Sequence, residues 1–99
     1  MPLTLKFSAK ARRDLLEISG YLQRRSPQGA KSVLRAIERS CLLLAETPLA
    51  ARRTNMESVR VKPLSRHPYQ IFYRVEGKIL YVVHVWHSAR KPVSEKKLL

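Results

Sequence analysis

Acidic residues are scarce in this sequence: seven Asp and Glu stand against 20 Lys and Arg. Most of the acids fall in stretches with helical periodicity, and no two of them form a pair suited to acid–base catalysis. No cluster of metal ligands, glycine-rich phosphate loop or nucleophile–histidine–acid array is visible. The sequence therefore argues against hydrolases that need paired carboxylates or a metal, and we expect no cofactor and no metal site.

Cysteine, glycine and long apolar runs are also rare. The single Cys41 excludes an internal disulfide and a Cys-based metal site, which favours a reducing cytoplasm. No run approaches the ~20 apolar residues of a membrane span, and the N-terminus has no apolar segment typical of a signal peptide. With three glycines and no low-complexity tract, no linker divides the chain. We expect one cytoplasmic domain over residues 1–99 without a membrane partner, in which about 93–99 form a tail.

Positive charge is what the sequence has in excess. The formal net charge is +13 over 99 residues. A surface of this kind binds polyanions or an acidic protein. Solubility alone is the alternative explanation of the charge.

The first half of the chain has the periodicity of one strand and two helices. Apolar and polar residues alternate over residues 3–7, as in a strand with one face on a core. Helical spacing follows over about 9–24, with Ser8 as the N-cap. Ser26-Pro27 opens a second helix, which Thr47-Pro48 ends. The short break between the helices predicts an antiparallel helical hairpin.

The second half predicts strands. Residues 49–58 are polar, basic and aperiodic, which predicts a loop. Alternation returns over 59–62, where Pro63 ends the strand or places it at a sheet edge, and again over 69–75. Residues 79–86 are apolar on both faces, which indicates a central strand that forms a hairpin with 69–75.

Together these elements predict an α+β fold in the order strand-helix-helix-strand-strand-strand. The N-terminal helical hairpin packs on one face of a small, mainly antiparallel four-stranded sheet. We expect the other face to carry function through basic and polar side chains, which are Arg60, Lys62, Gln70 and Arg74.

The candidate site residues are mainly cations near the strands. Arg60 and Lys62 are two positions apart, which aims both side chains the same way at a spacing suited to neighbouring phosphates. An ordinary solvated edge is the alternative. His87 and Arg90 lie just past the last strand, where side chains become accessible, either as a functional corner or as a cap of the sheet.

His84 has a different interpretation. Strict alternation places it on the strand face of Leu80, Val82 and Trp86. This apolar setting predicts an interior histidine with a satisfied hydrogen bond rather than a ligand.

The strand 69–75, its tight turn into 79–86, and the following His87-Ser88-Ala89-Arg90 resemble the RelE/ParE superfamily of toxins from bacterial toxin–antitoxin modules. The resemblance extends over nearly the whole chain. It implies a small cytoplasmic toxin in a hetero-oligomeric complex with a cognate antitoxin, typically acidic and partly disordered. A net charge of +13 suits such a partner.

The superfamily has two main branches with different targets. RelE-like members cleave mRNA on the ribosome, whereas ParE-like members act against DNA gyrase. Arg60, Lys62 and Arg90 match positions where RelE-like nucleases carry cations, and His87 is the candidate for moving a proton. Gln70 stands at a position where the resemblance to those nucleases implies a second catalytic arginine.

The tail 91–99 also has no tyrosine where the nucleases often place one. A nuclease here lacks two usual parts, unless Arg66, Arg74 or His87 replaces them. Loss of one contact that stabilises the transition state typically costs about a hundredfold in rate. Residues 72–75 and the His87-x-x-Arg90 spacing are more similar to the ParE-like branch.

Three hypotheses follow. The first is a ParE-like toxin that acts on DNA gyrase without chemistry of its own, through target- or phosphate-binding cations: Arg60, Lys62, Arg66, Arg74 and Arg90. The second is a RelE-like ribosome-dependent mRNA endonuclease, with the catalytic candidates Arg60, Lys62, His87 and Arg90. The third is a non-catalytic basic nucleic-acid-binding module.

Overall fold

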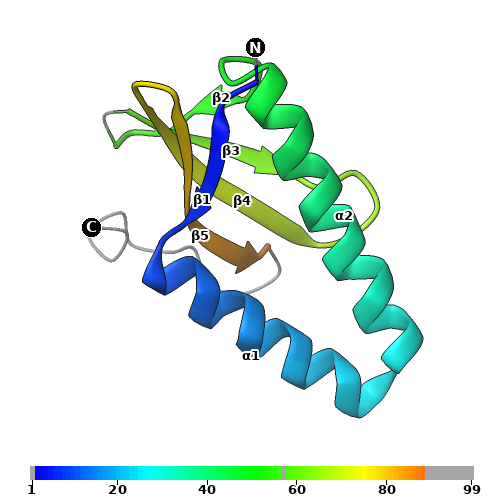
Figure 1. Cartoon of the computed structure of the whole chain (residues 1–99). Helices are drawn as coiled ribbons and strands as arrows, with labels where there is room; N and C mark the ends of the chain where they lie inside the picture. Colours follow the sequence, from blue (N-terminus) through cyan, green and yellow to red (C-terminus); the bar gives the residue numbers. More distant parts are fainter. Residues whose placement is uncertain (1, 57, 89–99) are drawn as a thin grey trace.

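The structure, a computed structural model, describes residues 2–56 and 58–88, so Arg90 and the predicted tail lie outside the described residues. Within those two ranges the chain forms two helices and five strands (Figure 1). In chain order they are β1 (Thr4–Phe7), α1 (Ala9–Arg25), α2 (Pro27–Glu46), β2 (Arg52–Arg53), β3 (Val59–Pro63), β4 (Tyr69–Glu76) and β5 (Ile79–His87). Neither helix in the described ranges is long and apolar enough to cross a membrane.

Serine side chains begin both helices where the sequence predicts them. The Ser8 Oγ accepts a hydrogen bond of 3.0 Å from the N–H of Ala11, and Ser26 caps α2 in the same way. Ser26 also closes α1, because its own N–H donates to the carbonyl of Leu22 at 2.7 Å. Pro27 then occupies the first helical position, where a missing N–H costs little. One residue thus separates the helices, which fold back on each other as the predicted hairpin (Figure 1).

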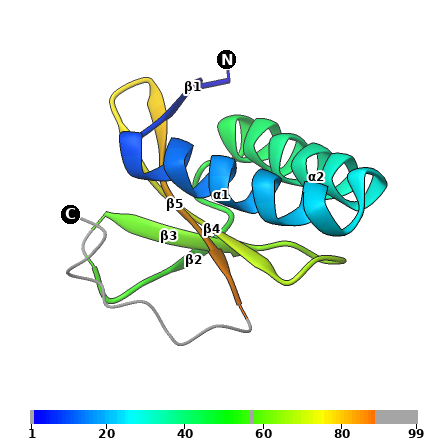
Figure 2. The same ribbon diagram turned by 90° about the horizontal axis from the view of Figure 1, so that it is seen from below.

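The sheet has the strand order β1-β5-β4-β3-β2. β1 is parallel to β5, and the other neighbours are antiparallel. Both helices cover one face of this sheet (Figure 2). The predicted α+β fold is therefore confirmed, and so is the central position of the last strand, since β5 lies between β1 and β4.

The predicted count of four strands is wrong, because a short fifth strand forms in the segment expected to be a loop. Arg52 and Arg53 of β2 pair with Val61 and Arg60 of β3. Two adjacent exposed cations show no alternation of apolar and polar residues, so no strand pattern is visible in the sequence. The pairing arises because the edge of β3 offers free backbone groups.

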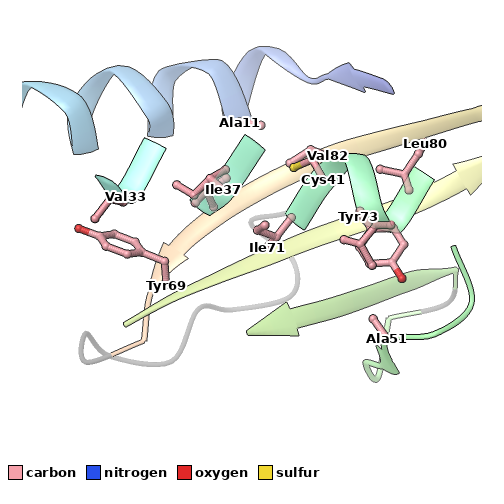
Figure 3. Packing of buried hydrophobic residues seen from close by; sticks show 12 residues of the cluster. Ala11, Val33, Ile37, Cys41, Ala51, Tyr69, Ile71, Tyr73, Leu80 and Val82 are labelled. Carbon is pink, nitrogen blue, oxygen red and sulfur yellow. The ribbon is translucent and has the colours of Figure 1, made fainter. Parts of the chain in front are cut away.

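The main core fills the space between the helices and the sheet (Figure 3). Ile37 and Cys41 face the sheet from α2, and Ile71 faces them from β4. Ile71 is fully buried, and burial of such a side chain stabilises a fold by about 2 kcal/mol. As predicted, alternate residues of β4 share this face: Tyr69, Ile71, Tyr73 and Val75.

The opposite face of the sheet is apolar rather than basic. A second cluster of buried side chains lies there, formed by Val59, Val61, Phe72 and Val83. Met56, Tyr81 and Trp86 pack against it. The centre of this face is therefore apolar, in contrast to the basic and polar face that the sequence predicts.

The cations of β3 lie on the helix-covered face. Arg60 is paired with Tyr73 and Lys62 with Ile71, and directly paired residues of antiparallel strands share a face. The prediction that both cations share an open face with Gln70 and Arg74 is therefore wrong. Alternation within β3 shows which residues lie together, but only the pairing with β4 decides which face they occupy.

A β-bulge in β5 changes its alternation. Phe72 pairs with His84 and Tyr73 with Val82, which leaves Val83 without a partner on β4. Leu80 and Val82, before the bulge, belong to the main core. His84 instead has its ring centroid 5.8 Å from that of Phe72 on the other face. The predicted shared face of His84 with Leu80 and Val82 is wrong, because one inserted residue reverses the phase.

Candidate functional site

Arg60 lies beside the connection that follows α2. Its Nη1 donates to the carbonyl oxygens of Ala51, at 2.8 Å, and Leu49, at 3.2 Å. The hydroxyl of Tyr73, the residue paired with Arg60, donates to the carbonyl of Pro48 at 2.6 Å. Burial raises the pKa of Tyr73, and the charge of Arg60 offsets part of that shift. The two side chains therefore hold the connection 48–51 against the sheet.

Lys62 lies on the same face as Arg60, two positions further along β3. Its side chain is exposed and forms no ion pair with any of the described residues. The predicted pair of cations thus has unequal members. Arg60 is engaged with backbone carbonyls, whereas Lys62 extends into solvent.

Arg74 lies near Arg60, and Arg66 lies apart from both. The Nε of Arg74 is 2.9 Å from Oε1 of Glu76, and its guanidinium carbon lies 5.4 Å from the ring centroid of Tyr81. Arg66 is exposed in the loop between β3 and β4, next to α2. Arg74 lines one hollow with Arg60 and Arg53, whereas Arg66 belongs to a different hollow.

His87 ends β5 next to α1. Its ring meets the ring of Tyr69 edge-on, with centroids 5.0 Å apart and planes at 82°. It also lines a small cavity of about 70 Å³, together with Glu17 and Tyr21 of α1 and Trp86 of β5. His87 is therefore half-buried at the sheet corner that the sequence predicts as functional.

Arg60 and His87 do not form one site. Arg60 pairs with Tyr73 and His87 pairs with Tyr69, four positions away on β4. This separation is roughly 13 Å along the strands, and two strand spacings add about 10 Å across them. The catalytic candidates that the structure describes are thus divided between two corners of the sheet, and Arg90 lies outside the described residues.

A buried hydrogen-bond network between α1 and β5 was missed by the sequence reading. Asp14 Oδ2 accepts from Nδ1 of His84 at 2.5 Å and from the backbone N–H of Val85 at 3.0 Å. Asp14 Oδ1 accepts from Nζ of Lys10 at 2.6 Å. Burial raises the pKa of Asp14, but these hydrogen bonds outweigh burial, so the pKa lies below its ordinary value.

This network confirms the prediction of an interior His84 with a hydrogen-bond partner. The ring is 1% exposed, and Asp14 is buried beside it. A signal for the pair is present in the sequence, because Asp14 falls three positions after Ala11 and four before Ile18, within the apolar stripe of α1. An acid in such a stripe requires a buried partner.

A basic groove along α2 was missed as well. It runs between α2 and the loop that joins β3 to β4, which lie side by side in Figure 1. We call it the α2 groove, and its polar lining consists of Gln28, Lys31, Ser32, Arg35, Arg39, Ser40, Ser65, Arg66 and His67. The signal in the sequence is a cation at every fourth position of the helix: Lys31, Arg35 and Arg39.

The described side chains are suited to binding more than to covalent chemistry. Cys41 is fully buried, and burial raises its pKa to about 12, so it is a protonated thiol at neutral pH. The buried Asp14 holds His84 in a hydrogen bond. The surface offers Arg, Lys and His donors for anionic groups.

The helical hairpin on a mainly antiparallel sheet is the fold that the resemblance to the RelE/ParE superfamily implies, with five strands in place of four. The family model described as "ParE toxin of type II toxin-antitoxin system, parDE" matches residues 5–92. The chain belongs to this ParE toxin family, and its expected kinship with the RelE/ParE toxins is confirmed.

Two relatives are similar over most of their length. Toxin RelE1 of Caulobacter vibrioides is 27% identical over 89 residues, which cover 89% of this chain and 96% of the relative. Putative toxin Y4kP of Sinorhizobium fredii is 33% identical over 82 residues, which cover 81% and 85%. One of these relatives is named after the RelE branch, and the name of the other refers to neither branch.

Solved structures show the same fold. The chromosomal ParDE toxin–antitoxin system from P. aeruginosa contains a chain that matches with a TM-score of 0.74 and 26% identity, covering 86% of this chain and 95% of that one. The RelBE2 toxin–antitoxin complex from Mycobacterium tuberculosis matches with a TM-score of 0.61 and 23% identity, covering 88% and 99%. Because its identity is only 23%, the RelBE2 match is evidence for the fold alone.

Proposed function

We propose that this toxin arrests growth by acting on DNA gyrase through a protein contact, without catalysis of its own. The proposal is supported by the match of residues 5–92 to the ParE family model and by the likeness to a ParDE chain with a TM-score of 0.74. The observation that carries it is the separation of Arg60 from His87. A nuclease site needs its phosphate-binding and proton-transferring groups within a few ångströms of one phosphate.

The position of Gln70 supports the same choice. It lies on β4, where the resemblance to RelE-like nucleases expects a second catalytic arginine, and it is paired with Trp86 and Pro63. Its amide cannot supply the positive charge that stabilises a developing phosphorane. A recognition surface has no such requirement.

We propose further that a cognate acidic antitoxin neutralises the toxin in a hetero-oligomeric complex in the cytoplasm. The net charge of +13 favours fast association with an acidic chain. The similar ParDE chain, at 26% identity, comes from a toxin–antitoxin system. A short acidic protein encoded beside this gene is the expected partner.

The test is inhibition of gyrase in vitro by the purified chain. We expect loss of DNA supercoiling by gyrase, and recovery of supercoiling when the antitoxin is added in equal amount. Translating ribosomes programmed with an mRNA are the parallel assay, in which we expect no cleavage. Full supercoiling activity together with cleaved mRNA would overturn the proposal.

The ribosome-dependent endonuclease is the second candidate, favoured by the likeness to Toxin RelE1 of Caulobacter vibrioides. It predicts that Arg90→Ala abolishes mRNA cleavage while the far-UV circular dichroism and the unfolding temperature stay unchanged. Lys62→Ala is the companion variant, since its exposed side chain contributes nothing to the core. Intact mRNA with the unsubstituted toxin removes this candidate.

A further inference from the structure

The α2 groove is a strongly basic hollow. Lys31, Arg35, Arg39 and Arg66 line it, with His67 beside them, and no Asp or Glu is part of its lining. Glu38 lies between two of the arginines in sequence but does not line the groove. The groove has a volume of about 840 Å³, so it extends over several side chains.

The cations of the groove are free to bind a ligand. Arg35, Arg39 and Arg66 are exposed, and none of the three forms an ion pair with a carboxylate of residues 2–56 or 58–88. Arg60 and Arg74, by contrast, are engaged with backbone carbonyls and with Glu76. The α2 groove therefore presents a set of cations that the fold leaves unneutralised.

The spacing of these cations matches a polymer of anions. Lys31, Arg35 and Arg39 recur every four residues, so they lie on one face of α2 and are roughly 6 Å apart along its axis. Arg66 and His67 approach from the loop on the opposite wall. A row of charges with a second wall of donors can contact successive phosphates of one strand.

We propose that the α2 groove binds the phosphodiester backbone of a nucleic acid. The remaining lining favours phosphate over an acidic peptide, since it includes three serine hydroxyls and a glutamine amide that donate to phosphate oxygens. Large apolar side chains in the lining are limited to Leu43 and Leu64, whereas a peptide that folds on binding needs apolar anchors. Binding by backbone charge is independent of base sequence.

The inference does not depend on gyrase, since affinity is measured with nucleic acid alone. The probes are short fluorescein-labelled oligonucleotides of one sequence, prepared as duplex DNA, single-stranded DNA and RNA. The groove variant combines Arg35→Ala, Arg39→Ala and Arg66→Ala. The matched control combines Arg12→Ala, Arg13→Ala and Arg24→Ala. These three arginines of α1 are exposed, and their substitution removes the same charge as the groove variant.

We expect the groove variant to bind at least one probe about tenfold more weakly, with the slope of log affinity against log salt reduced by about 2 to 3. The control variant should lose no more than about twofold, since it changes only the long-range field. The probe whose affinity falls most in the groove variant shows whether the groove binds DNA or RNA. Unchanged unfolding temperatures confirm that both variants are folded.

Two results would overturn the inference. Equal losses in the groove and control variants would mean that only the net charge matters. A groove variant that keeps its affinity for all three probes but loses affinity for a polyglutamate peptide would assign the groove to an acidic protein segment instead.

Discussion

The carboxylate of Asp14 on α1 and the imidazole of His84 on β5, 70 positions apart in the sequence, are joined by a hydrogen bond of 2.5 Å. The same carboxylate accepts the N–H of Val85, beyond the point where β1 stops pairing with β5 at Val82. Asp14 thus supplies a hydrogen-bond acceptor to a backbone N–H of β5 that β1 does not pair with. The pair fixes the start of the helical hairpin on the sheet.

Asp14→Asn should lower the free energy of unfolding by about 3 kcal/mol, because an amide offers only one acceptor oxygen where the buried carboxylate accepts from His84, Val85 and Lys10. Urea unfolding followed by circular dichroism measures the change. Glu17→Gln is the matched control, since it removes one exposed charge from the same helix and should cost less than about 0.5 kcal/mol. Equal effects would contradict the buried network.

The same pair sets a dependence of stability on pH. The folded-state pKa of Asp14 is depressed below the ordinary value of 3.8, so its contribution is complete above that pH and is lost as the pH falls through the lower folded value. Asp14→Asn should remove this acid-labile part and flatten the profile below about pH 4. A profile of the same steepness in both proteins would show that other carboxyls control acid unfolding.

Arg60→Ala should destabilise the fold by about 1.5 kcal/mol, because the carbonyls of Leu49 and Ala51 lose a charged donor. Lys62→Ala removes the same charge from an exposed side chain and should change stability by less than about 0.5 kcal/mol. Thermal unfolding of the two variants side by side gives the comparison. If both lose gyrase inhibition but only Arg60→Ala loses stability, the charge of β3 has a role in binding that is separate from its role in the fold.

Cys41 should be inert in the native protein and reactive only after unfolding. It is fully buried with a pKa raised to about 12 by burial, which removes both access and thiolate. A colorimetric disulfide reagent should therefore label the thiol at a rate that follows urea-induced unfolding. Rapid labelling without denaturant would show that α2 opens away from the sheet.

The sequence alone determines the elements whose signals are local. Helical spacing of apolar residues, serine caps at Ser8 and Ser26, and alternation in β4 all depend on neighbours a few positions away. The family resemblance rests on the same continuous stretches. These parts of the prediction agree with the structure because nothing distant is needed to define them.

Only the tertiary structure decides which faces and side chains meet. Alternation groups Arg60 with Lys62, but the register against Tyr73 and Ile71 places them on the sheet face that carries the helices instead of on the opposite face. The bulge at Val83 shifts the alternation of side chains along β5 by one residue. No residue type at this position predicts a bulge from the sequence. The distance between Arg60 and His87, the contact of Asp14 with His84, and the α2 groove all follow from strand order and helix packing. Periodicity fixes spacing along one element, whereas a site depends on positions between elements, and those are set by the packing of the whole core.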